Sequence, residues 1–229
     1  MTSASRLGLA ACLSIAAVWA GAQVYLSRGA THTDRGIPAP AGEASMPIAA
    51  DQNSPFDAAP PAKIPDRLPE MTLANLEGKP TSISHWQGKS LMINFWATWC
   101  PPCRREIPLL QSLHDEKAAE NIEIVGIAVD YVDKVRAFRD QFKISYPLLV
   151  GEQDALDLVA ALGVEQPAFP FTVFTDRRGQ IVALYMGELK RAAADSILSV
   201  VAQLNADRIA LPAARIRISE QIAALREKT

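Results

Sequence analysis

Two cysteines separated by two residues are the part of this sequence best suited to chemistry. Cys100 and Cys103 flank Pro101 and Pro102, and the chain of 229 residues contains only one other cysteine, Cys12. A chain of this size can fold without disulfide staples, and a stapled secreted scaffold would need more cysteines spread along its length. The pair therefore points to reactive sulfur that cycles between a dithiol and a disulfide and needs no bound cofactor.

The pair lies between a strand pattern and a helix pattern. Residues 91–96 are apolar and aromatic, as expected of a buried central strand, and residues 100–118 have helical spacing. The first turn of a helix presents unpaired N–H groups and a partial positive charge, which favour a thiolate. We therefore expect Cys100 to have a lowered pKa and to act as the nucleophile. Cys103, one turn later, is expected to attack the mixed disulfide and release the partner.

The two prolines between the cysteines change this expectation. Proline suits the start of a helix because its φ is preset, but Pro101 and Pro102 have no N–H to direct at the Cys100 sulfur. We expect a less stabilised thiolate, and hence a more reducing couple, than other intervening residues would give.

Other chemistries of a Cys-x-x-Cys pair remain open. A structural zinc site would need a second pair, and the chain has none; the three histidines also lack the spacing of metal ligands, so no metal is expected. A metal-binding module would have to use Cys100 and Cys103 alone. A disulfide oxidase or isomerase would use the same residues with a more oxidising couple. A peroxidase of the peroxiredoxin type would place its reactive cysteine in a Thr-x-x-Cys setting.

The first 65 residues precede the region of regular pattern. Residues 7–26 carry no formal charge and are mostly apolar, and about 20 such residues are enough for a helix to cross a bilayer. We expect residues 1–29 to form an uncleaved signal-anchor, with a cleaved signal peptide or lipidation at Cys12 as alternatives. Residues 30–65 contain seven of the sixteen prolines and no sustained periodicity, so we expect a flexible linker.

From residue 66 onward, strand and helix patterns alternate. Strands are expected at residues 71–76, 81–84, 91–96, 122–129, 146–150, 171–175 and 181–186, and helices at 100–118, 132–142, 154–162 (capped by Asp154) and 190–204. This order predicts an α/β fold in residues 66–206, with a mixed central sheet flanked by helices on both faces and an N-terminal β-hairpin turning at residues 77–79.

Residues 207–229 form a separate stretch after the predicted domain. Ile218, Ile222 and Leu225 lie on one face of a short predicted helix, which we expect to pack on its own domain in a monomer; a dimer contact is the alternative. The net charge of −2 gives no reason to expect binding to nucleic acid.

The segment around the two cysteines resembles the active-site segment of the TlpA/ResA/CcmG group. The likeness is carried by residues 94–108 (NFWATWCPPCRREIP), and it extends over about residues 66–204 and to the anchor and linker. Members of that group are membrane-anchored, thioredoxin-like thiol–disulfide oxidoreductases of bacteria. The resemblance implies a thioredoxin-like fold, a single pass through the inner membrane and a catalytic domain in the periplasm. It also implies a protein disulfide as substrate and a membrane electron donor for re-reduction.

The resemblance also suggests which residues contact a partner. Trp99 matches the aromatic residue before the nucleophile, and Pro170 matches a cis-proline that lies beside the two sulfurs. A cis bond there exposes the backbone of Phe169 for strand-like pairing with a partner. The expected substrate-binding residues are Trp99, Pro101, Pro102, Phe169 and Pro170. Phe171 either adds to an apolar platform for the partner or packs in the core.

Glu106 is the expected proton acceptor. Thioredoxin places a buried aspartate in the central strand where this chain has Asn94, which cannot titrate. Glu106 lies one helical turn after Cys103, where the TlpA/ResA group often has an acid. A partly buried glutamate has a raised pKa and can take the proton of the resolving thiol, so Glu106 joins the two cysteines as a predicted catalytic residue. A solvated helix glutamate is the alternative.

The function that the resemblance implies is reduction of extracytoplasmic protein disulfides. Such a reductase would serve one of two pathways, cytochrome c maturation or the assembly of a copper oxidase through a copper-delivery protein. The Gly-Ala-Pro-Glu-like stretch of the members dedicated to cytochrome c is absent around Pro170, and no residue specifies the copper route.

Overall fold

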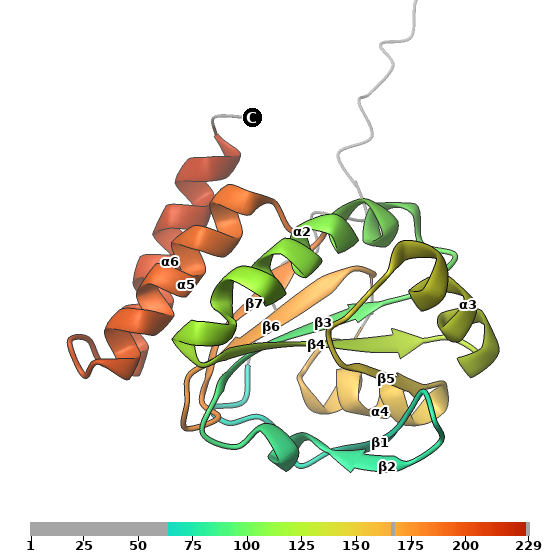
Figure 1. Cartoon of the computed structure of the whole chain (residues 1–229). Helices are drawn as coiled ribbons and strands as arrows, with labels where there is room; N and C mark the ends of the chain where they lie inside the picture. The colour runs from blue at the N-terminus through green and yellow to red at the C-terminus, as the bar shows by residue number, and fades with distance from the viewer. Residues whose placement is uncertain (1–63, 166–167, 228–229) are drawn as a thin grey trace, which may run out of the picture. The chain divides into compact units, whose positions relative to one another are not determined.

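The computed structural model of this chain describes residues 64–165 and 168–227 (Figure 1). The expected signal-anchor at residues 1–29 and nearly all of the expected linker at residues 30–65 lie outside these ranges. Among the helices that are described, none combines the length and the apolar character needed to cross a membrane.

Within the described ranges, seven strands form one mixed sheet. They are β1 (Thr72–Asn75), β2 (Pro80–Ser82), β3 (Ser90–Trp96), β4 (Ile122–Val129), β5 (Leu148–Gly151), β6 (Phe171–Thr175) and β7 (Ile181–Met186). The strand order is β2-β1-β5-β4-β3-β6-β7. Strands β3, β4 and β5 run parallel, and every other neighbouring pair is antiparallel. The predicted mixed sheet and the predicted β1–β2 hairpin are therefore confirmed.

Helices cover both faces of this sheet, as predicted. The helices are α2 (Pro101–Lys117), α3 (Val132–Phe142), α4 (Gln153–Ala161), α5 (Arg191–Asn205) and α6 (Leu211–Arg226), with short 3-10 helices η1 (Ile83–Trp86) and η2 (Ala118–Glu120). Side chains of α2, α3 and α5 belong to the core on one face, whereas α4 and η1 contribute to the core on the other, and Figure 1 shows α2 and α4 on opposite sides.

The two cores follow from the alternation of side chains along β3. Met92 and Trp96 belong to the core beneath α2, while Ile93 and Phe95 belong to the opposite one. Every residue of β3 is buried. A strand buried on both faces reads as a continuous apolar run, which is the pattern of residues 91–96.

Two local predictions are wrong. The strand expected at residues 81–84 ends at Ser82, because the Ser82 hydroxyl accepts a hydrogen bond from the Ser84 N–H at 3.1 Å and starts η1. Asp154 does not cap its helix: α4 begins one residue earlier, so Asp154 lies inside the first turn and accepts from the Ala155 N–H at 3.0 Å.

Helix α6 packs on the rest of the fold. It is longer than the short helix predicted, its contacts are mainly with α5 and β7, and Figure 1 shows it beside α5. Ile218 is buried in the core beneath α2, and Ile222 and Leu225 pack against that core. The Arg215 guanidinium donates to the Ile181 carbonyl at 2.7 Å, which ties the helix to the start of β7.

Loss of the buried face of α6 should therefore destabilise the whole fold. Ile218→Ala should lower the free energy of unfolding by about 2–4 kcal/mol, because it opens a cavity where the side chain is 5 % exposed. Ile216→Ala, two positions away on the same helix and 59 % exposed, should change it by less than about 0.5 kcal/mol. Urea unfolding of both variants checks this, and equal effects would contradict the packing described.

Candidate active site

Cys100 and Cys103 form a disulfide at the start of α2. Cys100 is the N-cap residue, with an extended backbone, and α2 begins at Pro101, with four residues between it and the end of β3. The Cys103 N–H donates to the Cys100 sulfur at 3.2 Å. Because Pro101 and Pro102 have no N–H, this is the one backbone donor to that sulfur within the described residues.

The two cysteines differ in their access to solvent. Cys100 is 4 % exposed, whereas Cys103 is fully buried. A partner approaching from outside therefore meets Cys100 first. This order agrees with the one expected from the helix start, in which the first cysteine is the nucleophile and the second resolves the intermediate.

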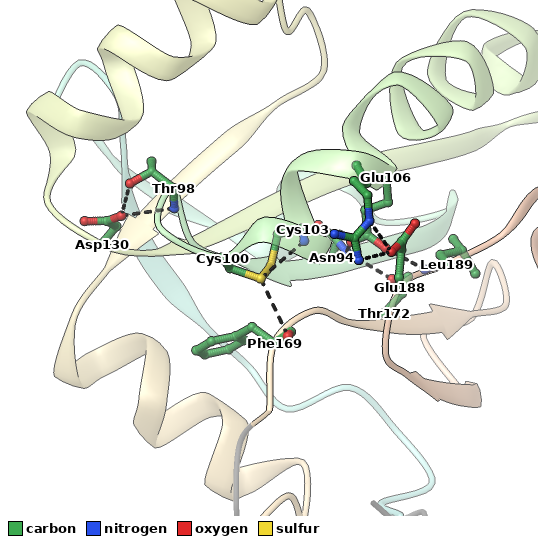
Figure 2. The surroundings of a disulfide bond; sticks show 11 residues. Asn94, Thr98, Cys100, Cys103, Glu106, Asp130, Phe169, Thr172, Glu188 and Leu189 are labelled. Carbon is green, nitrogen blue, oxygen red and sulfur yellow. Dashed lines mark hydrogen bonds and ion pairs between the residues drawn. A yellow bond between two sulfur atoms is a disulfide. The ribbon is translucent and has the colours of Figure 1, made fainter. Parts of the chain in front are cut away.

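The Phe169–Pro170 segment lies against the disulfide. Its peptide bond is cis, which confirms the prediction for Pro170. The Phe169 carbonyl oxygen is 3.6 Å from the Cys100 sulfur (Figure 2), and since a disulfide sulfur carries no hydrogen, this is a van der Waals contact. The rings of Phe169 and Trp99 meet edge-on with their centres 6.2 Å apart.

The residues predicted to bind substrate are not equally accessible. Trp99 is 63 % exposed, Pro101 is exposed and Phe169 is half-buried. Pro102 and Pro170 are buried, because Pro102 faces into the fold from the first turn of α2 and Pro170 directly precedes the buried strand β6. The structure therefore brings the predicted set together around the disulfide, but only Trp99, Pro101 and Phe169 present surface to a partner.

Phe171, which the sequence left undecided, is a core residue. It is fully buried, and its ring stacks on that of Phe95 with centres 4.5 Å apart. Alternation along β6 directs Phe171 to the face of the sheet opposite α2, which removes it from the surface around the sulfurs.

Glu106 is buried beneath the active-site helix. Its side chain is 1 % exposed, so the alternative of a solvated helix glutamate is wrong. Oε1 accepts from Asn94 Nδ2 at 2.7 Å, and Oε2 accepts from the Leu189 N–H at 2.6 Å (Figure 2). Burial raises the pKa of the Glu106 carboxyl from 4.5 to about 7, although the hydrogen bonds from Leu189 and Asn94 act in the opposite direction. This confirms the expected raised pKa.

A second glutamate, Glu188, directly precedes Leu189, whose N–H binds the Glu106 carboxyl. Glu188, in the connection between β7 and α5, pairs with Arg105 at 2.6 Å and also with Lys190. Partial burial by itself would raise the pKa of Glu188, but the hydrogen bonds from Arg105 and Lys190 hold it below its ordinary value. The ion pair joins the first turns of α2 to the residue before Leu189. Sequence reasoning missed this contact because 83 residues separate its partners.

A second missed contact holds the loop before the disulfide. The Asp130 carboxylate accepts from the Thr98 N–H at 3.1 Å and also from the Thr98 hydroxyl, and its other oxygen accepts from the Tyr131 N–H at 2.8 Å. Strands β3 and β4 are parallel neighbours, so their carboxyl ends meet at one edge of the sheet. An aspartate directly after the second strand was the signal that could have predicted this contact.

Comparison with known proteins extends these observations. The profile of the AhpC/TSA family matches residues 64–186. The thioredoxin-like protein YneN of Bacillus subtilis is 31 % identical over 129 residues, which are 55 % of this chain and 72 % of YneN. The thiol-disulfide oxidoreductase ResA of Halalkalibacterium halodurans is 26 % identical over 141 residues, covering 61 % of this chain and 78 % of ResA.

A solved structure gives the same result for the fold. A thiol:disulfide interchange protein of the thioredoxin family from Chlorobium tepidum superposes with a TM-score of 0.54 at 27 % identity, covering 61 % of this chain and 97 % of the other. The α/β fold predicted from the sequence is therefore thioredoxin-like.

The buried carboxyl should make the stability of the oxidised protein depend on pH. An unfolded chain releases the Glu106 proton near pH 4.5, whereas the fold retains it to about 7. Between these values the folded state binds the additional proton, so the free energy of unfolding should fall by about 3 kcal/mol as the pH rises from about 4 to about 8. Glu106→Gln should lack this contribution.

Urea unfolding across this pH range checks the prediction. The difference in unfolding free energy between the natural protein and Glu106→Gln should change with pH over this range. A difference that is constant with pH would show that the Glu106 carboxyl titrates in the fold as it does in the unfolded chain.

Proposed function

We propose that this chain, which belongs to the AhpC/TSA family, is a protein thiol–disulfide oxidoreductase of the thioredoxin-like kind that reduces disulfides of partner proteins. The observation that carries this proposal is the Cys100–Cys103 disulfide at a helix start, one turn from a buried carboxyl that is poised to exchange a proton near neutral pH. The names of the relatives, thiol-disulfide oxidoreductase ResA among them, support it.

The reaction begins from the reduced dithiol. The Cys100 thiolate attacks one sulfur of a partner disulfide, and the other partner sulfur leaves as a thiolate. The Cys103 thiol then gives its proton to the Glu106 carboxylate. The resulting thiolate attacks the Cys100 sulfur, which forms the Cys100–Cys103 disulfide and releases the second partner thiolate. Two electrons pass to the partner, and the disulfide in the structure corresponds to the end of this sequence.

The surface around Cys100 supports a protein partner rather than a small molecule. Trp99 and Pro101 are exposed beside the sulfur, and the Phe169 carbonyl lies against it. A backbone carbonyl next to the reacting sulfur can pair with an extended partner segment, while the indole ring offers a large apolar contact. We assign substrate binding to Trp99, Pro101 and Phe169, with Pro102 and Pro170 shaping the site from beneath.

Reduction is the direction that we propose. The sulfur of Cys100 accepts a hydrogen bond from Cys103, and the two residues between them cannot contribute another. A thiolate with fewer donors is less stabilised, so the dithiol is a stronger reductant than in sites whose helix start supplies more N–H groups.

The cellular setting is also a proposal. We place residues 1–29 in the bacterial inner membrane as a single-pass anchor, with the catalytic domain in the periplasm as a monomer. A membrane electron donor would then return the Cys100–Cys103 disulfide to the dithiol. Cytochrome c maturation and assembly of a copper oxidase are the two candidate pathways, and both rest on the resemblance to the TlpA/ResA/CcmG group.

Restoring an N–H at the helix start should make the couple more oxidising. Pro102→Ala supplies a donor at the second helical position, where backbone N–H groups reach the N-cap side chain. A hydrogen bond to a charged sulfur should shift the equilibrium constant with glutathione by roughly tenfold towards the dithiol. Pro108→Ala, two turns further along α2, should leave that constant unaltered. Redox titration of the three proteins checks this, and no shift in Pro102→Ala would remove the argument for a reductase.

Trapping of mixed disulfides in cells tests the reaction itself. Cys103→Ser should accumulate proteins linked through Cys100, because the resolving thiol is absent, whereas Cys100→Ser should accumulate none. Equal trapping by both variants would contradict the assigned roles.

Peroxide consumption that depends on Cys100, or stoichiometric metal bound by the purified reduced protein, would instead favour a peroxidase or a metal-binding module.

A further inference from the structure

The side-chain amide of Asn94 is at the centre of the buried polar groups beneath α2. Its Nδ2 donates to Glu106 Oε1 at 2.7 Å and to Thr172 Oγ1 at 3.1 Å, so both amide protons are used (Figure 2). Its Oδ1 is buried and has no hydrogen-bond partner among the described residues. A buried carbonyl oxygen without a donor is uncommon in folded proteins and calls for a physical reason.

The strand register accounts for this arrangement. In the sheet, Asn94 is paired with Thr172 of β6 on one side and with Gly126 of β4 on the other. Side chains of directly paired residues point to the same face, so the Thr172 hydroxyl is next to the amide. Gly126 has no side chain with which to satisfy Oδ1. The hydrogen-bond partners of the amide within the described residues are therefore Glu106 and Thr172, and both are reached through Nδ2.

The Glu106 carboxyl accepts a hydrogen bond from the Asn94 amide when ionised and can donate one when protonated, and the Thr172 hydroxyl can do either. The oxygen and nitrogen of an amide are nearly equal in size, so rotation by about 180° about the Cβ–Cγ bond exchanges them with little change in packing. In the observed orientation the amide donates to two acceptors, which suits an ionised Glu106. In the rotated orientation Oδ1 would accept from a protonated Glu106 and from the Thr172 hydroxyl, because a hydroxyl both accepts and donates.

We propose that Asn94 is a positioning residue whose amide rotates when Glu106 takes the proton of Cys103, so that the carboxyl is hydrogen-bonded in both of its protonation states. The proton moves from Cys103 Sγ to Glu106 Oε1, since Oε2 continues to accept from the Leu189 N–H. This inference rests on the role of Glu106 in the proposed function. Rotation of Asn94 transfers neither a proton nor an electron.

Other titratable groups around Glu106 do not replace this role. Those that face it from other elements are Glu188 and Lys190 in the connection between β7 and α5, Tyr146 before β5 and Tyr185 in β7. Within the described residues none of these four forms a hydrogen bond with the Glu106 carboxyl, whose partners are the Asn94 amide and the Leu189 N–H. Of the two partners of the Glu106 carboxyl, only the Asn94 amide can therefore change from hydrogen-bond donor to acceptor.

Nuclear magnetic resonance of the oxidised natural protein tests the rotation directly. The side-chain carbonyl carbon of Glu106 reports the midpoint of its titration. Above that midpoint, the Asn94 amide protons should show a nuclear Overhauser effect to the Thr172 methyl group, and below it this effect should be lost as the amide nitrogen turns away. An effect that persists unchanged through the Glu106 titration would overturn the proposal and leave the proposed function intact. Absence of any Glu106 titration would instead remove Glu106 from the proposed reaction, and this inference with it.

A variant gives an independent kinetic measurement. Asn94→Leu has a similar volume but cannot donate to the carboxylate, so Glu106 should remain protonated to higher pH and accept the Cys103 proton less readily. Release of a thionitrobenzoate group from a mixed disulfide at Cys100 should slow about fivefold near pH 7 and about tenfold at lower pH, and the midpoint of its pH profile should rise by about one unit.

Thr172→Ser is the matched control, because it keeps the hydroxyl that pairs with either amide orientation; its profile should match that of the natural protein. An Asn94→Leu protein that retains its melting temperature and its glutathione equilibrium but shows an unshifted pH profile would overturn the proposal. If Asn94→Leu does not fold, the nuclear Overhauser measurement on the natural protein decides the question alone.

Discussion

The buried carboxyl of Glu106 joins three elements of this fold. It projects from the active-site helix, accepts from Asn94 of the central strand, and accepts from the backbone of Leu189 after the last strand. Burying a carboxyl in an apolar core is unfavourable unless donors satisfy it, so these two hydrogen bonds are what permits Glu106 to lie beneath α2. The same burial brings its proton affinity near to neutrality, where a group can accept a proton and later release it.

The sheet topology brings separate loops to the two sulfurs. The carboxyl ends of the parallel strands β3 and β4 meet at one edge, where Asp130 holds the backbone of Thr98 two residues before Cys100. Strand β6 runs antiparallel to β3, so its start lies at that same edge and places Phe169 against the disulfide. Cys100, the loop before it and the Phe169 carbonyl are thus positioned by three adjacent strands rather than by local sequence.

Residues near both ends of the described chain bind the outer side of β7, the last strand. β7 is at the edge of the sheet, and an exposed edge is a site for unwanted pairing with another chain. The Asp66 backbone carbonyl accepts from the Ile181 N–H at 2.9 Å, and Arg215 of α6 donates to the Ile181 carbonyl, so the start of β7 is hydrogen-bonded on its outer side. The stretch after residue 206 is therefore part of the packed fold, because it covers an edge that the seven strands leave open.

The sequence by itself determined the features that depend on near neighbours. The Cys-Pro-Pro-Cys segment between an apolar run and a helical pattern was sufficient to predict the strand, the helix start at Cys100 and the dithiol chemistry, since each depends on residues within one or two turns. The resemblance to a known group, which runs over about residues 66–204, added the cis bond at Pro170 and the placement of Glu106. The position of Asp154 and the end of β2 were predicted wrongly, because a cap or a strand end depends on competing hydrogen bonds whose energies differ little.

Only the tertiary structure decided which distant groups meet at the site. Leu189 is 83 residues from Glu106 and Thr172 is 78 residues from Asn94, and no local pattern marks either as a partner. Phe171 could have faced the sulfurs or the core until the register of β6 against β3 directed it away from α2. Contacts of this kind are determined by how the sheet is ordered and how the helices pack on it, and a linear sequence states neither.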